Sequence, residues 1–69
     1  MRVYIFFMRS RDVIRALKAA GFEKVAQKGS HLQFKNPLRK GRVTVPHPQA
    51  DLPIGTLKSI ERQSGIKLS

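Results

Sequence analysis

The segment from 28 to 35 combines a tight-turn residue, a titratable side chain and flanking cations. Gly29 permits the positive φ that a short connection between two extended segments often needs. The residues after the turn alternate between polar and apolar, as in a half-buried strand: His31, Leu32, Gln33, Phe34 and Lys35. One face of that strand therefore carries an imidazole, which exchanges protons near neutral pH, beside an ammonium group.

These residue types suit work on a phosphodiester. RNA supplies its own nucleophile, the 2′-OH, so a protein can cleave it without a metal by positioning the backbone, moving a proton and stabilising charge on the phosphate. His31 is the candidate catalytic residue, and no cofactor or metal is required. The candidate RNA-binding residues surround it in the sequence: Lys28, Gly29, Ser30, Gln33, Lys35, Arg39, Lys40 and Arg42.

Other interpretations of the histidines remain open at this point. A single histidine on a strand is more often a surface or packing residue than a catalyst. A metal site is poorly supported, because His31 and His47 lie far apart and the chain has no cysteine. His47, between two prolines, is expected to shape a turn. The sequence leaves open whether His47 or water completes acid–base catalysis.

Size and charge narrow the class of partner. The chain has 69 residues, which predicts a single domain over 1–69, and 14 Lys and Arg against 4 Asp and Glu give a formal net charge of +10. Such a field attracts polyanions, with nucleic acid first, an acidic protein second and an anionic membrane third. The lack of cysteine favours an intracellular, cytoplasmic protein. No apolar run is long enough to cross a membrane. The alternative is that the charge confers solubility alone.

Two amphipathic helices are predicted, one near each end of the chain. From Ser10 onward, apolar residues recur at helical spacing: Val13, Ile14, Leu17 and Ala20. Ser10 is the expected N-cap and Gly21 the residue that ends this helix. The second helix is expected to start near Asp51, as N-cap, and Pro53, and to end at Gly65.

Three strands are expected between the helices, over 23–27, 30–35 and 42–45, with a loop over 36–41. Prolines 46 and 48 should end the sheet. Short connections favour a three-stranded antiparallel sheet, so the predicted fold class is α+β in the order α-β-β-β-α. Both helices would cover one apolar face of that sheet, formed by Val25, Leu32, Phe34, Val43 and Val45. The other face stays open.

The first residues, MRVYIFF, are apolar but too short for a signal-peptide core or a membrane span. They are expected to be extended, as an edge strand or a contact to a second chain, if Met1 is the biological start. The alternative is that translation begins at Met8, in which case residues 1–8 include an extension that precedes the domain.

Three stretches together resemble the HicA family of toxins from type II toxin-antitoxin systems: SRDVIRALKAAGF, QKGSHLQFKNP and GRVTVPHPQADLPIGTLKSIERQSGI. The resemblance covers 10–67, and the GSH segment, the VPHP turn and the DLPIGTLKSI helix make it specific. It implies a fold like that of a double-stranded-RNA-binding domain and a metal-independent endoribonuclease (mRNA interferase) that arrests translation. The family's catalytic histidine corresponds to His31.

The resemblance also implies partners. A HicB-like antitoxin would cover the active face of the toxin and connect it indirectly to operator DNA, and mRNA would be the substrate. Two hypotheses compete with the enzyme. The first is a non-catalytic RNA-binding module of the same fold, and the second is an interaction protein whose basic face exists for an acidic partner.

Overall fold

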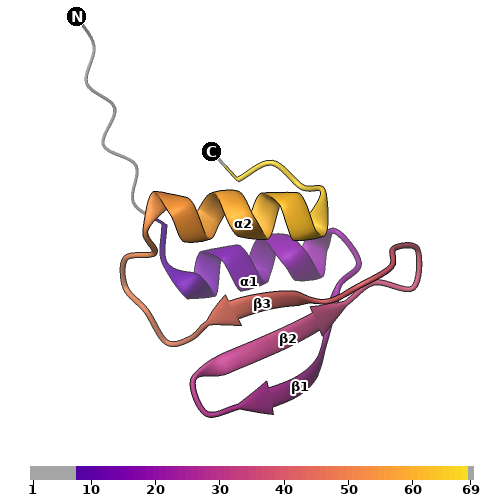
Figure 1. Ribbon diagram of the computed structural model, residues 1–69, viewed down its shortest axis with the longest axis horizontal. Helices are drawn as coiled ribbons and strands as arrows, with labels where there is room; N and C mark the ends of the chain where they lie inside the picture. Colours follow the sequence, from indigo (N-terminus) through magenta and orange to yellow (C-terminus); the bar gives the residue numbers. More distant parts are fainter. Residues whose placement is uncertain (1–7, 69) are drawn as a thin grey trace, which may run out of the picture.

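The computed structural model describes residues 8–68. Its elements follow the predicted order: helix α1 (Ser10–Ala19), strands β1 (Glu23–Lys28), β2 (His31–Lys35) and β3 (Val43–Pro46), and helix α2 (Ile54–Ser64). Figure 1 shows both helices on one side of the sheet, side by side. The α+β prediction is therefore confirmed. The expectation for the first seven residues lies outside the described part of the chain.

Helix α1 ends as predicted but begins differently. Gly21 takes a φ of +96°, its N–H donates to Lys18 O (3.0 Å) and the N–H of Phe22 donates to Leu17 O (2.9 Å). This pair of bonds is a Schellman motif. At the other end, Arg9 occupies the N-cap position and makes no side-chain capping bond. The prediction of Ser10 as N-cap was wrong, because its hydroxyl is engaged by a segment distant in sequence, residues 47–49.

The start of α2 also differs from the sequence-based expectation. Pro53 occupies the N-cap position, and Asp51 lies before it without capping the helix. Leu52 separates the two; it is buried, and its N–H donates to Met8 O at 3.0 Å. Leu52 is therefore anchored immediately before the N-cap residue of α2. Gly65 ends the helix in the left-handed region, at φ +76°, as predicted.

The sheet is an antiparallel meander in the order β1-β2-β3. Gly29 and Ser30 connect β1 to β2, with φ +57° at Gly29 and negative φ at Ser30, a pattern typical of a type II′ hairpin turn. Beyond the turn, Lys28 pairs with His31, and His31 pairs with Pro46 on the other side. The central strand β2 thus places His31 between its two neighbours.

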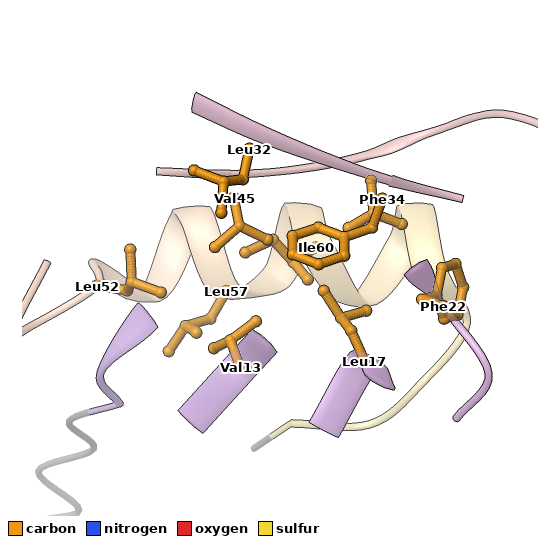
Figure 2. Packing of buried hydrophobic residues seen from close by; sticks show 10 residues of the cluster. Val13, Leu17, Phe22, Leu32, Phe34, Val45, Leu52, Leu57 and Ile60 are labelled. Carbon is orange, nitrogen blue, oxygen red and sulfur yellow. The ribbon is translucent and has the colours of Figure 1, made fainter. Parts of the chain in front are cut away.

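The core lies between the helices and one face of the sheet, and Figure 2 shows side chains from both layers meeting there. The buried apolar residues are Val13, Leu17, Phe22, Leu32, Phe34, Val43, Val45, Leu52, Leu57 and Ile60. Four of the five predicted inward sheet residues are among them. Val25 is not, with 49% of its surface exposed, because the β1 register shifts between Lys24 and Ala26 and moves Val25 out of the alternation.

Candidate active site on the open face

His31 stands at the start of the central strand, on the face that the helices leave uncovered. It is exposed, while the next residue, Leu32, and Phe34 point into the core. Residues that are paired across a sheet share a face, so Lys28 and Pro46 flank His31 on the same side. Lys28 is therefore the direct cross-strand neighbour of His31, whereas Lys35, the ammonium group on the same face of the strand, lies at the other end of β2.

A guanidinium group lies further along the same face. Arg42 Nη1 donates to Gln33 Oε1 at 2.6 Å, and Gln33 follows His31 by two positions on β2. Side chains two positions apart on a strand lie on one face about 7 Å apart. The bond to Gln33 therefore holds the Arg42 guanidinium against the side chain two positions from His31, on the same exposed face.

The remaining predicted RNA-binding residues lie farther away. Lys35 shares the open face, but it ends β2 and pairs with Glu23. Arg39 and Lys40 lie in the loop beyond β2, about 13 Å or more along the chain direction from His31. The Arg39 guanidinium packs against Gly65 at the end of α2, where an added Cβ would lie 2.5 Å from Nη1. Arg39 is thus directed towards the helix layer.

Two residues that the sequence analysis assigned to other tasks lie next to this site. Ser10 Oγ and His47 Nδ1 are 2.6 Å apart, and the backbone N–H of His47 donates to Ser30 O at 2.7 Å. An open pocket of about 320 Å³ borders this pair, lined by Arg9, Ser10, Arg11, His47, Pro48, Gln49 and Ala50. His47 does shape the turn after β3. Its bond to Ser10 joins residues 37 positions apart, and no local spacing rule predicts such a contact.

The site supplies one exposed imidazole, an ammonium group and a guanidinium group on an open surface. Such a surface can bind successive phosphates and move a proton. Within residues 8–68, no group of three or more His, Cys, Asp or Glu is arranged to hold a metal ion. Neither helix of this part of the chain is long and apolar enough to cross a membrane.

Comparison with known proteins agrees with the fold and the motifs. The model of the HicA toxin family of bacterial toxin-antitoxin systems matches residues 10–66, from the first residue of α1 to just beyond α2. A search of curated proteins finds no match. A toxin of this family implies an antitoxin as the other member of the pair. Since the match covers both helices, the whole sheet and the His31 turn, the chain belongs to the HicA toxin family.

Proposed function

We propose that this toxin is a metal-independent endoribonuclease that cleaves mRNA and thereby arrests translation, with His31 as its catalytic residue. The observation that carries the proposal is the exposed position of His31 on the uncovered sheet face, beside Lys28 and near the Gln33–Arg42 pair. A phosphodiester can approach this face without any rearrangement of the core.

The reaction would use the RNA 2′-OH as nucleophile. Its oxygen attacks the adjacent phosphorus while the bond from phosphorus to the 5′-oxygen breaks, giving a 2′,3′-cyclic phosphate and a 5′-hydroxyl end. His31 would take the proton from the 2′-OH or give one to the departing 5′-oxygen. Lys28 and Arg42 would bind phosphate oxygens and stabilise the charge that develops there. DNA lacks the 2′-OH and would remain uncut.

The proposed partners follow from the charge of the open face and from the family. A HicB-like antitoxin would cover this basic face and block RNA, and it would connect the toxin to operator DNA. The toxin would act on mRNA in the cytoplasm. A net charge of +10 favours an acidic surface on the antitoxin that contacts the open face.

The test is cleavage of labelled single-stranded RNA by the purified chain in the presence of EDTA. Wild type should produce fragments ending in a 2′,3′-cyclic phosphate, and His31→Ala should slow cleavage by about 100- to 10,000-fold, the contribution typical of general acid–base catalysis. Affinity for an uncleavable 2′-O-methyl RNA should stay within a few-fold, because the cations remain. The same sequence as DNA should stay whole.

The competing hypotheses predict different results in this assay. A non-catalytic RNA-binding module would retard the RNA without cutting it, and its affinity would fall steeply with salt. An adaptor for an acidic protein would neither cut RNA nor bind it with that salt dependence. Intact RNA after prolonged incubation with wild type, or equal cleavage by His31→Ala, would contradict the proposed function.

A further inference from the structure

A continuous series of hydrogen bonds runs from the start of α1 to the turn that carries His31. The N–H of Gln49 donates to Ser10 Oγ (2.9 Å), and the N–H of Ser10 donates to Gln49 O (2.9 Å). Ser10 Oγ then contacts His47 Nδ1 (2.6 Å), and the N–H of His47 donates to Ser30 O (2.7 Å). The helix and the turn are thereby joined through the segment that follows β3.

Ser10 is the buried residue at which the bonds to Gln49 and His47 meet. Only 1% of its surface is exposed, and its hydroxyl accepts one bond from Gln49 while retaining a proton to donate. That proton can go to His47 Nδ1, or to Gln49 O (3.2 Å) when Nδ1 itself carries a proton. The contact to Ser10 therefore persists in either tautomer of the imidazole. In the described part of the chain, no buried side-chain nitrogen or oxygen lacks a partner.

The last bond of the series acts on the peptide unit next to His31. Ser30 O belongs to the peptide group that joins Ser30 to His31, so the N–H of His47 restrains the backbone just before the imidazole. Other support for the turn comes from the Lys28–His31 strand pair and from Gln27 Nε2, which donates to Gly29 O (3.3 Å) on the exposed surface. Lys28, Gly29 and Ser30 are themselves exposed, so no core packing fixes the turn. An added Cβ on Gly29 would meet no atom within 4 Å.

The alternation of the sheet separates the two histidines. Pro46 pairs with His31 on the open face, and the bond from His47 to Ser30 continues the ladder by one residue. Because successive side chains of a strand point to opposite faces, the His47 ring lies on the face opposite to His31, where it contacts Ser10 of α1. This geometry does not direct the His47 ring at a phosphodiester bound over His31.

We propose that Ser10 and His47 are positioning residues that fix the peptide before His31 and so align its imidazole with the RNA. This inference rests on the proposed function, because it concerns the same site. It assigns His47 a role through its Nδ1 atom and its backbone N–H, and none in proton transfer to RNA.

The first experiment compares Ser10→Ala with Ser64→Ala. Ser64 is a matched control: it is 2% exposed, and its hydroxyl donates to Ile60 O (2.7 Å) and accepts from the N–H of Ile66 (3.2 Å), at the far end of α2 from the His31 turn. Ser10→Ala should lower the single-turnover rate at saturating RNA by about 10- to 100-fold, since small misplacements of a catalytic group have effects of this size. RNA affinity should change little, and Ser64→Ala should retain the wild-type rate.

Temperature and folding are controlled in the same series. All variants are compared at a temperature where circular dichroism shows them folded, so that a purely structural role for Ser10 would give Ser10→Ala and Ser64→Ala the same rate. Equal rates for Ser10→Ala and wild type, or equal losses in the two alanine variants, would overturn the proposal.

The second experiment separates positioning by Nδ1 from chemistry at Nε2. In His47→Asn a side-chain amide atom can occupy the place of Nδ1 and keep the bond to Ser10, whereas His47→Gln places its amide near Nε2 and loses that bond. His47→Asn should stay within about threefold of the wild-type rate, and His47→Gln should fall about 10- to 100-fold. Equal, large losses in both variants would assign the ring to proton transfer and overturn the positioning role.

A measurement that needs no cleavage keeps the two proposals distinguishable. Hydrogen exchange of the His47 amide, followed by NMR, should be slow in wild type and in Ser64→Ala, and at least tenfold faster in Ser10→Ala and His47→Gln. If wild type leaves RNA whole, the proposed function fails, and this exchange pattern alone decides whether the network restrains the turn. Unchanged exchange in Ser10→Ala would overturn the inference.

Discussion

The two ends of the sheet carry similar cations in the sequence but are built differently. At the turn end, residues 28–31, Lys28 and His31 form an exposed cross-strand pair. At the loop end, residues 36–42, Asn36 is buried and Arg39 packs against the end of α2. The turn end offers its polar groups to solvent, whereas two polar side chains of the loop end attach the loop to the helix layer.

This difference shows that a cluster of cations in the sequence need not be one site. Residues 28–42 contain five Lys and Arg, which the alternation and loop content alone place in a single basic field. In the structure the length of β2 separates the turn end from the loop end. Arg42 is the exception, because its bond to Gln33 brings it back towards His31. Substitutions at matched positions of the two ends can test the distinction.

The largest effect on stability is expected at the loop end, from Asn36→Ala. Asn36 is 7% exposed, its Nδ2 donates to Ala20 O (3.1 Å), and its Oδ1 accepts from the N–H of Leu38 (2.9 Å). Losing both bonds, and leaving Ala20 O without this donor, should cost about 1–3 kcal/mol in the free energy of unfolding. For a domain of this size each kcal/mol lowers Tm by about 4–8 °C. Calorimetry measures the shift.

The rate of RNA cleavage distinguishes a loss of stability in Asn36→Ala from a change in the candidate active site. At a temperature where Asn36→Ala is folded, its rate on RNA should equal that of wild type within about threefold, because the turn end is untouched. A loss of activity larger than the unfolded fraction explains would mean that the two ends of the sheet are coupled, which would contradict their separation.

Much of the fold follows from local patterns. The alternation of Leu32 and Phe34 with polar neighbours predicts which face of β2 packs against the helices. Gly21 and Gly65 mark where the helices end, because each takes a positive φ that other residues avoid. The position of His31 on the open face follows from the same alternation. These features depend on residues that are close together in the sequence, so they can be predicted from the sequence without knowledge of the tertiary contacts.

The features that sequence patterns did not give depend on contacts between distant segments. The bulge at Val25 changes which side chains of β1 face the helices, and a hydrophobic residue in a short strand gives no sign of it. Ser10 has the residue type of an N-cap, and only the approach of 47–49 shows that its hydroxyl serves another purpose. Likewise, the direction of Arg39 depends on where α2 ends.

Two glycine substitutions, one at each end of the sheet, test the difference between the turn end and the loop end, and their effects on stability are expected to be intermediate in size. Gly29 in the turn end has φ +57° and Gly41 in the loop end has φ +83°, and an added Cβ would meet nothing within 4 Å at either position. Gly29→Ala and Gly41→Ala should therefore each destabilise by backbone strain alone, about 1–2 kcal/mol. Thermal unfolding should show similar shifts for both variants.

Their activities should differ. Strain at Gly29 is relieved by moving the turn, and with it the backbone before His31, so Gly29→Ala should slow cleavage by about tenfold while Gly41→Ala stays near wild type. Rates are measured at saturating RNA and at a temperature where both variants are folded. Equal loss of activity in the two variants would show that the turn end has no special relation to the chemistry.

The smallest effects are expected from removing single charges, with Lys28→Gln and Arg39→Gln as the pair. Lys28 lies beside His31, so its loss should reduce the slope of log Kd against log salt for uncleavable single-stranded RNA by about 0.7, the value for one phosphate contact. Arg39 faces the C-terminal end of α2, where a cation stabilises the helix dipole. Arg39→Gln should leave the slope unchanged and lower the free energy of unfolding by about 0.3–1 kcal/mol. Equal slope changes in both variants would instead favour one continuous basic field, with Arg39 leaving Gly65 to contact RNA.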